Sequence, residues 1–532
     1  MNTKRVILIG LDGLGWNEIK EWVNDDCLSN INTLASEGCR KDLASTHPPW
    51  TPVAWPSLLS GKNPGKHGIF DFFTREGYDK RLVERPDIDA AYVHEVADAL
   101  GQTPVVINFP LTHPATQLEN GAVVPGYLAR EDVKFYPEGL RDDYESEFGK
   151  YRIYPDYGAE ENQIQEYIEV ARHRRDMATF LAERYDWDFL AVQFQVTDSI
   201  FHDLSNRNDI RSVLEKIDGF IGDIRQLGND DTPLFIVSDH GMGDYEWTFY
   251  VNSWLMNEGY CETTIGEENY FRSVKNSLKG KDPKPKNKSS DIIQTIIQNF
   301  TKIGLSPYNT YQFLSTLGLS SVVEKLIPEE ILVSAQSQVV DYPNSKAFQI
   351  YFNSLGIHIN VDGREPQGQV LSDDYESLRT ELIDKLESTI GPDGKPVFDK
   401  IQRCEEVYEG DHMKEAPDLV LFPRDFQYDV SGSIMGPFRS YAHKNHKPDG
   451  ILISNNQLEK KDKMEIYDIA PTIASTLGIP IDEDTDGTVV GDGPSEISEK
   501  NWDELVSYKT NSASNQDTSD VEDRLADLGY ME

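Results

Sequence analysis

Cysteine and cationic side chains are scarce in this chain of 532 residues. Its four cysteines are widely separated and form no Cys-x-x-Cys pair, which argues against a disulfide framework or a thiolate zinc site and fits a reducing compartment. Lysine and arginine number 51 against 91 acidic residues, a formal net charge of −40. This balance argues against nucleic-acid binding, which draws on cationic surface, and indicates adaptation to high salt, where the repulsion is screened.

Long apolar runs are also absent. No stretch reaches the roughly 18 apolar residues that a membrane-spanning helix needs. The N-terminal apolar run ends at Asp12, which predicts a first strand rather than a signal peptide. We therefore expect a soluble cytoplasmic protein without a membrane span.

What the chain does contain is an alternation of short β-branched runs with helical patterns. This alternation is typical of an α/β fold with a mostly parallel central sheet and helices on both faces. The predicted strands are 5–12, 103–109, 187–195, 233–239 and 450–454. The predicted helices are 162–184, 209–226, 374–389 and 466–477, the last with Gly478 as its C-cap.

The sequence changes in character between residues 256 and 340, where lysines cluster around "GKDPKPKNKSS". We interpret this segment as an inserted cap or lid, whose lysine-rich loop either attracts a phosphorylated substrate or is simply solvated. The catalytic core would then comprise residues 1–255 and 341–505. Residues 506–532 are expected to be a flexible linker with a short terminal helix.

Three predicted strands run directly into acidic groups. They deliver Asp12, then Asp198 with His202, and then Asp239 with His240. Ligands bind at the carboxyl ends of strands in open α/β sheets, so these groups should converge in one crevice. One aspartate at a strand end is more often a helix cap, but three such ends favour a shared site.

Carboxylates combined with imidazoles are the ligand set of zinc, manganese or iron(II) rather than of magnesium or calcium alone. A last ligand is expected from "YAHKNHKPDGILIS". His446 precedes a Pro-Asp-Gly turn and another strand, so we expect it on a loop at the sheet edge. His443 is the competing candidate.

Thr51 lies between Trp50 and Pro52 in "PPWTPVAWPSLLSGKNPGKHG". It either caps a helix that starts at Pro52 or places a hydroxyl at a helix N-terminus, where an anion binds. Four further side chains are candidates for substrate contact: Lys62, Asn63, Asn108 and Tyr127. For Lys62 a surface position is the alternative.

Taken together, "LDG", "PPWTPVAWPSLLSGKNPGKHGI", Asp-x-x-x-His, "SDHGM" and His-x-Pro-Asp-Gly resemble the alkaline phosphatase superfamily. The type I phosphodiesterases and nucleotide pyrophosphatases are the most similar branch, together with related prokaryotic phosphohydrolases. The likeness covers most of residues 1–255 and 340–500. It implies an alkaline-phosphatase-like fold and a phosphoric ester hydrolase that acts on a small phosphorylated substrate, namely a nucleotide, sugar or lipid phosphoester.

The resemblance also implies a pair of divalent metal ions about 4 Å apart, either zinc or manganese. Carried over by motif, one ion is held by Asp198, His202 and His446, and the other by Asp12, Asp239 and His240, with Thr51 also in contact. Thr51 would then be the nucleophile and would pass through a covalent phosphothreonine.

The chain also departs from the family pattern. Eukaryotic nucleotide pyrophosphatases carry an asparagine shortly after "HGI", where this chain has Phe72. This departure leaves monoesters, sugar or lipid diesters and other oxyanions open as substrates.

The alternatives to a phosphoric ester hydrolase are a phosphotransferase or phosphomutase, a sulfatase, and a non-catalytic member stabilised by metal. The sequence around Thr51 lacks the Cys or Ser and the Arg that a sulfatase needs.

Overall fold

The computed structural model describes residues 5–156, 162–265, 338–351, 353–458, 463–491, 498–506 and 521. The chain forms two compact units. Unit 1 comprises Met1–Tyr245, Arg403–Ala416 and Ala442–Glu532, and unit 2 comprises Glu246–Gln402 and Pro417–Tyr441. Every residue that the sequence predicts as a metal ligand, nucleophile or substrate contact belongs to unit 1.

Unit 1 is built on an eight-stranded sheet with the order β19-β2-β18-β8-β1-β7-β5-β6. In that order the strands are Met464–Glu465, Cys39–Ala44, Asp449–Ser454, Leu234–Val237, Val6–Leu11, Phe189–Phe194, Pro104–Ile107 and Ala122–Val124. Only β18 among them runs antiparallel to its neighbours, β2 and β8. The predicted α/β fold with a mostly parallel sheet is confirmed.

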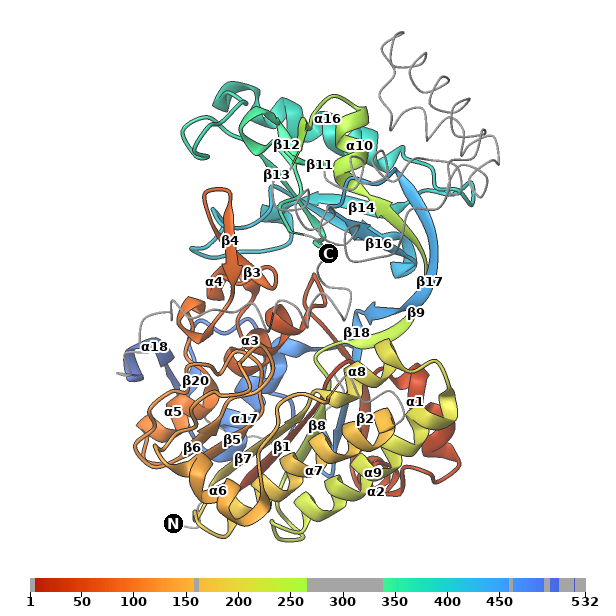
Figure 1. Cartoon of the computed structure of the whole chain (residues 1–532). Helices are drawn as coiled ribbons and strands as arrows, with labels where there is room; N and C mark the ends of the chain where they lie inside the picture. Colours follow the sequence, from red (N-terminus) through yellow and green to blue (C-terminus); the bar gives the residue numbers. More distant parts are fainter. Residues whose placement is uncertain are drawn as a thin grey trace, which may run out of the picture. The chain divides into compact units, whose positions relative to one another are not determined.

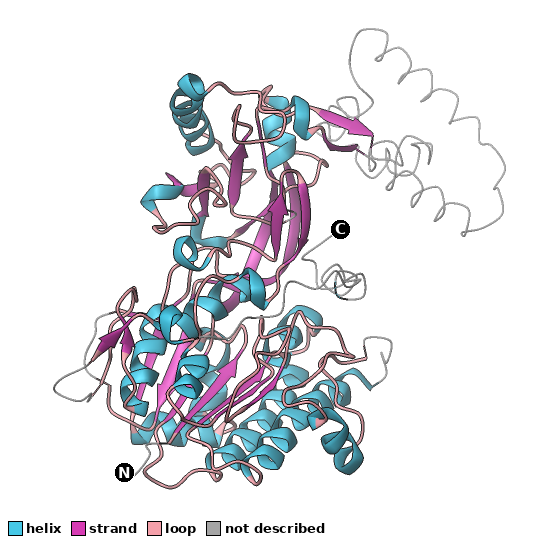
Figure 2. Cartoon of the chain, turned by 90° about the vertical axis from the view of Figure 1, so that its left-hand side faces the viewer, coloured by secondary structure: helices cyan, strands magenta, loops and turns pink. Residues whose placement is uncertain are grey.

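The central strands are apolar because helices cover both faces of this sheet (Figures 1 and 2). Every residue of β1, β7 and β8 is buried. On one face α7 (Gln163–Ala182) packs against β5 and β7 and beside α9 (Arg207–Arg225). On the other, α5 (Val93–Ala99) packs against β5 and α17 (Ile469–Leu477) against β1.

The five predicted strands are found as β1, β5, β7, β8 and β18. The four predicted helices are found as α7, α9, α17 and, in unit 2, α16 (Tyr375–Glu387). Gly478 ends α17 in the left-handed conformation with φ 75°, as predicted. The other elements of unit 1 are α1 (Trp16–Asn24), α2 (Ser29–Glu37), α4 (Pro64–His67), β3 (Phe73–Glu76), β4 (Asp79–Leu82), α6 (Leu140–Phe148), α8 (Val196–Asp203), β20 (Ile481–Asp482), β21 (Glu499–Lys500) and α18 (Trp502–Leu505).

Helix α3 (Thr51–Ser60) begins one residue earlier than its sequence suggests. Trp50 is the N-cap, with φ −106° and ψ 135°, and Thr51 is the first helical residue. The interpretation of Thr51 as a helix cap is therefore wrong, because a helical residue cannot fold its hydroxyl back as an N-cap does. All ten residues of α3 are buried, so the helix lies inside unit 1.

Unit 2 contains a four-stranded sheet of order β12-β13-β15-β14 and a three-stranded sheet of order β16-β9-β17. The first consists of Ala347–Phe348, Gly356–Ile359, Leu419–Pro423 and Phe398–Arg403, and the second of Tyr428–Ser431, Gly241–Tyr250 and Phe438–Lys447. Strands β10 (Thr263–Ile265) and β11 (Gln338–Val340) pair separately, and α10 (Val251–Asn257) follows β9 directly. The unit boundaries fall within β9, β14 and β17 and between Ala416 and Pro417.

Two predicted segments lie almost entirely outside the described residues. The inserted cap at 256–340 is described only at its two ends, and the terminal segment 506–532 only at positions 506 and 521. Both therefore stay predictions. In the part of the chain that is described, no helix is long and apolar enough to cross a bilayer.

Candidate active site

The predicted acidic groups meet at one edge of the unit 1 sheet. Asp12 follows β1, Asp239 and His240 follow β8, and Asp198 lies in the first turn of α8, just after β7. These three strands are adjacent and parallel, in the order β8-β1-β7, so their carboxyl ends coincide. The predicted convergence of the three strand ends is confirmed.

His446 joins this group from a distant part of the sequence. It lies in strand β17, rather than on the expected loop, and is fully buried. Its carbonyl accepts a hydrogen bond of 2.5 Å from the hydroxyl of Tyr245, which fixes its backbone. His443, the competing candidate, lies three residues earlier in the same strand and is half-buried, with its ring 5.8 Å from that of Tyr245.

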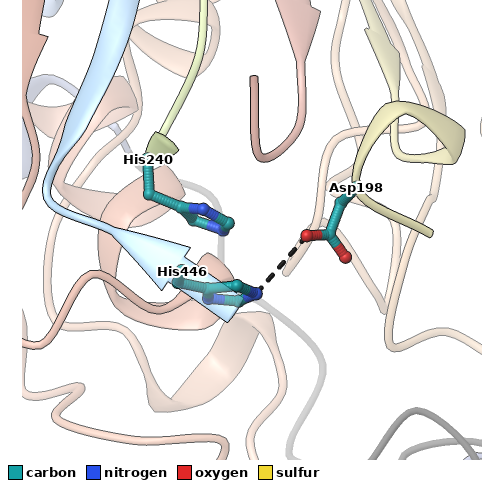
Figure 3. A group of neighbouring side chains, drawn as sticks. All are labelled: Asp198, His240 and His446. Atoms are coloured by element: carbon teal, nitrogen blue, oxygen red, sulfur yellow. Dashed lines mark ion pairs between the residues drawn. The ribbon is translucent and has the colours of Figure 1, made fainter. Parts of the chain in front are cut away.

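One cluster forms around Asp198. Its Oδ1 lies 3.3 Å from Nε2 of His202 and 3.4 Å from Nε2 of His446. The two Nε2 atoms are 3.3 Å apart. Figure 3 shows that the rings of His240 and His446 lie against each other beside Asp198; their centroids are 3.7 Å apart and the planes differ by 21°.

A second cluster adjoins it through His240. Nε2 of His240 lies 3.3 Å from Oδ2 of Asp239 and 3.6 Å from Oδ1 of Asp12. The Thr51 Oγ1 atom lies 3.3 Å from Oδ1 of Asp12 and 3.4 Å from Nε2 of His240. The threonine hydroxyl therefore touches this cluster directly.

Two of the histidines are held with Nε2 facing the carboxylates. Nδ1 of His240 lies 3.0 Å from the carbonyl oxygen of Gly241, and Nδ1 of His446 lies 3.1 Å from that of Pro49. A carbonyl only accepts, so each Nδ1 carries a hydrogen, and when the ring is neutral its Nε2 offers a lone pair. Burial, together with the neighbouring His240, lowers the pKa of His446 to about 3, which keeps this ring neutral.

Burial disfavours the charged form of all three carboxylates, and at two of them, Asp12 and Asp239, nothing nearby outweighs it. Burial raises the pKa of Asp12 well above its usual range, and the nearby Asp239 and Asp198 add to the effect. Burial does the same to the pKa of Asp239. Burial also disfavours the charged form of Asp198, but the facing imidazoles outweigh it and lower its pKa. Among the described residues, no lysine or arginine pairs with any of the three.

The residues fit divalent metal ions. Oδ1 of Asp198 and Oδ2 of Asp239 are buried and receive no hydrogen bond from the described part of the chain, although both face imidazole nitrogens. Two groups bring their ligand atoms within 4.8 Å of one another: Asp198, His240 and His446, and Asp12, Asp239 and His240. The second group agrees with the motif-based assignment. The first contains His240 where that assignment has His202.

The candidate substrate residues Lys62 and Asn63 have partners elsewhere. The ammonium group of Lys62 is buried and lies 2.9 Å from Asp482 and 2.8 Å from Asp503, so the alternative of a surface position is wrong. The side-chain amide of Asn63 donates to Asp486 over 3.0 Å. Their role in substrate binding stays a prediction.

Asn108 and Tyr127 are buried as well. The Asn108 amide donates to the side chain of Gln193 over 2.8 Å. The ring of Tyr127 packs edge-on against Tyr154, with centroids 6.0 Å apart. Substrate contact by these two residues is likewise still a prediction.

Three residues near the site were not found from the sequence. The Gly13 amide donates to Oδ1 of Asp239 over 3.2 Å, and a Cβ at this glycine, which has φ +65°, would lie 2.7 Å from Oδ1 of Asp198. Trp55 and Gln193 both donate to Asp12. Two features of the sequence could have indicated them. Trp55 lies four residues after Thr51 on the same helix, and Gln193 is a polar residue inside an apolar strand.

The sequence model of the type I phosphodiesterase / nucleotide pyrophosphatase family matches residues 6–449. The chain belongs to this family. The match includes both clusters and Thr51, and the predicted family resemblance is confirmed. As a member of the family, the protein is a metal-dependent phosphoryl hydrolase that acts on phosphoric esters.

Among the solved structures that align with this phosphodiesterase-family protein, a phosphonoacetate hydrolase shares its fold. Phosphonoacetate hydrolase from Sinorhizobium meliloti 1021, in complex with phosphonoformate, aligns with a TM-score of 0.53 at 11% identity, over 89% of this chain and 96% of that chain. Human ectonucleotide pyrophosphatase / phosphodiesterase 5 aligns with a TM-score of 0.46 at 11% identity, over 92% and 97%. The alkaline phosphatase PafA gives 0.49 at 12% identity, over 92% and 98%. No curated protein sequence matches the chain.

Proposed function

We propose that the protein hydrolyses a phosphate monoester or diester through a covalent phosphothreonine on Thr51. The Thr51 Oγ1–phosphorus bond forms while the bond from phosphorus to the leaving oxygen breaks, and the leaving group departs as an alcohol. Water then cleaves the Thr51 Oγ1–phosphorus bond, which releases the phosphoryl product and restores the hydroxyl.

The position of the Thr51 hydroxyl is the observation that carries this proposal. It lies at the first residue of a buried helix, 3.3 Å from a carboxylate oxygen of Asp12 and 3.4 Å from Nε2 of His240. A threonine hydroxyl is a weak nucleophile by itself and needs a neighbouring activator. Both residues that the Thr51 hydroxyl contacts, Asp12 and His240, belong to the same ligand cluster.

The resident group that fits these clusters is a pair of divalent cations, with zinc as our first choice and manganese as the second. When bound, the cations supply Lewis-acid stabilisation of the phosphoryl oxygens. We assign Asp198, His202 and His446 to one ion and Asp12, Asp239 and His240 to the other. His240 also satisfies the geometry of the first group, and its ring stacks on His446 between the two clusters.

The chain's own residues orient the Thr51 hydroxyl, fix the imidazole hydrogens and exclude water. Asp12 holds the Thr51 hydroxyl through its Oδ1 atom and so directs it toward the cluster. The carbonyls of Gly241 and Pro49 hold the hydrogens of His240 and His446 on Nδ1. Burial of Thr51, Asp12 and Asp239 excludes water from the nucleophile until substrate binds.

For the substrate we propose a small phosphoester of a nucleotide, sugar or lipid. Phe72 occupies the position where eukaryotic nucleotide pyrophosphatases carry an asparagine, and it is buried, with 4% of its surface exposed. An apolar ring cannot support a phosphoryl oxygen as an amide does. We therefore expect no strict preference for nucleotides.

The test compares wild-type protein with Thr51→Ala and Thr51→Ser. The substrates are 4-nitrophenyl phosphate, bis(4-nitrophenyl) phosphate and 4-nitrophenyl sulfate, assayed at high salt because the net charge is −40. Thr51→Ala should keep its metal content by elemental analysis but lose turnover by about 10³-fold or more. Thr51→Ser keeps a hydroxyl and should retain most of the turnover.

A second readout addresses the intermediate itself. Acid quenching during turnover, followed by peptide mass spectrometry, should find phosphate on Thr51 in the wild type. Undiminished turnover in Thr51→Ala would refute the nucleophile. Wild-type protein that binds metal but turns over none of the three esters would favour a non-catalytic member.

The four free cysteines also lead us to propose a reducing cytoplasmic setting, which cell fractionation can test.

A further inference from the structure

The carboxylate of Asp12 is held unequally at its two oxygens. Oδ2 accepts a hydrogen bond of 2.9 Å from Nε1 of Trp55 and one of 2.7 Å from Nε2 of Gln193. Oδ1 instead faces the Thr51 hydroxyl at 3.3 Å and Nε2 of His240 at 3.6 Å. Two N–H donors on Oδ2 occupy the lone pairs that a cation would use there.

The two donors are themselves fixed. Oε1 of Gln193 accepts a hydrogen bond of 2.8 Å from the Asn108 amide, and the Gln193 carbonyl accepts a second of 3.1 Å from the same group. Asn108 adopts φ +65°, and a Cβ at Gly126 would lie 1.9 Å from its carbonyl oxygen. Asn108, Gln193 and Asp12 are all fully buried, so the hydrogen bonds that connect them are shielded from solvent.

Strand β1 leaves room for the side chains of Trp55 and Gln193 because it carries a glycine, Gly10, beside them. A Cβ at Gly10 in β1 would lie 2.6 Å from Cη2 of Trp55 and 3.0 Å from Cγ of Gln193. Any larger residue at position 10 would push both side chains away from Asp12. The indole of Trp55 also packs edge-on against Phe109, with centroids 5.2 Å apart.

We propose that Gln193 and Trp55 are positioning residues that reserve Oδ2 of Asp12, so that Asp12 offers only Oδ1 to the metal ion beside Thr51. This inference rests on the proposed metal-dependent function. Oδ1 is the oxygen nearest the Thr51 hydroxyl, so the same arrangement keeps the ion on the side of the nucleophile. Hydrogen bonds of this kind orient a ligand and tune its basicity, and their loss typically costs about 10- to 100-fold in metal affinity.

The experiment measures metal affinity directly. Wild type, Gln193→Met and Trp55→Phe are stripped with a chelator and titrated with Zn²⁺ against a chromogenic competitor. Wild type should bind two ions. Each variant should bind one of them about 10- to 100-fold more weakly and the other with wild-type affinity. Only the ion held by Asp12 depends on the donors, so a merely structural effect would not divide the two sites in this way.

Matched controls make the same chemical changes elsewhere. Gln349 is a buried glutamine of unit 2 that donates to the Ser354 carbonyl over 3.0 Å, and Trp502 is a buried tryptophan that donates to the Pro480 carbonyl over 2.9 Å. Gln349→Met and Trp502→Phe should lower thermal stability as much as the test variants do. Both should bind two ions with wild-type affinity.

A spectroscopic measurement tests the one-oxygen mode of Asp12. In Gln193→Met, Oδ2 is partly released and becomes available to the metal, which raises the coordination number. Because visible Co²⁺ absorption weakens as coordination number rises, Co²⁺-loaded Gln193→Met should absorb less per ion than Co²⁺-loaded wild type. An unchanged spectrum with unchanged affinities in both variants would overturn the inference. Wild-type protein that binds no divalent ion would instead refute the proposed function.

Discussion

Asp418 in unit 2 and Asp239 in unit 1 are both buried, but their surroundings differ. Asp418 accepts two hydrogen bonds of 2.7 Å from the guanidinium of Arg364 and one of 2.6 Å from the hydroxyl of Tyr375. Burial alone would raise the pKa of Asp418, but Arg364 outweighs it and the pKa is lowered. Asp239 instead accepts a hydrogen bond from the Gly13 amide and faces the imidazole of His240, and burial raises its pKa.

The comparison distinguishes two kinds of buried carboxylate. Some are paired with a cation of the chain and stabilise the fold, and others lack such a cation and are available to bind a ligand. In unit 2 the chain supplies its own cation for Asp418. It does the same elsewhere in unit 1, where Lys62 pairs with Asp482 and Lys66 with Asp486. Beside Thr51, the part of the chain that the structure describes supplies no lysine or arginine to the aspartates. A buried carboxylate without a countercharge is costly, and in a cluster of ligand atoms it indicates a functional site.

The largest effect is expected from Asp239→Asn, which removes one uncompensated charge. With metal present, the variant should lose one bound ion and lose turnover by at least about 100-fold, because a ligand contributes more than the residues behind it. With a chelator present, its unfolding temperature should exceed that of the wild type, because a repulsive charge is gone. Scanning calorimetry with and without metal checks this reversal. A lower unfolding temperature under both conditions would mean that Asp239 is a structural residue like Asp418.

A stability loss without loss of chemistry is expected from Arg364→Met. Removing the guanidinium leaves Asp418 buried without its cation, which should cost about 3–5 kcal/mol of unfolding free energy. Adding Asp418→Asn should recover part of this loss, since the uncompensated charge is then gone. Denaturant titration measures both variants. The turnover per folded molecule should stay at the wild-type value, and a large fall in turnover would show that the Asp418 network also serves the site.

A smaller, pH-dependent effect is expected from His67, whose ring contacts helix α3. Nε2 of His67 lies 2.8 Å from the hydroxyl of Ser57 in α3, and burial lowers the pKa of His67 from 6.5 to about 3. The unfolded chain binds a proton below pH 6.5 while the folded chain does not. The unfolding free energy should therefore fall as the pH drops from 6.5 toward 3, by about 1.4 kcal/mol per pH unit for this residue.

Substitution of His67 isolates that contribution. His67→Gln should reduce the slope of unfolding free energy against pH in chelated protein. Ser57→Ala removes the hydrogen-bond partner but keeps the imidazole, so it should lower stability without flattening the slope. An equal slope in wild type and His67→Gln would exclude a neutral, buried His67 as a source of acid sensitivity.

The sequence was most informative where a local rule determines position. Asp12, Asp198 and Asp239 each follow a predicted strand, and parallel strands bring their carboxyl ends to one edge. Their convergence therefore required no knowledge of distant contacts. His446 was named from its motif, but its place within strand β17 depends on pairing between segments far apart in sequence.

Other residues were beyond local rules. Lys62 is buried because Asp482 and Asp503, more than 400 positions away, surround its ammonium group. Gln193 and Trp55 support Asp12 through side-chain directions that no spacing pattern encodes. Thr51 was recognised by its motif, yet its helical backbone depends on Trp50 adopting an extended conformation as the cap.

Elemental analysis of protein purified without added metal and without chelator is the most direct test of the central claim, that divalent cations balance the acids beside Thr51. The account predicts about two divalent ions per chain, in keeping with the two ligand groups, and a fall in unfolding temperature when a chelator removes them. Protein that contains no divalent ion, gains none on titration and melts at the same temperature with or without chelator would contradict it.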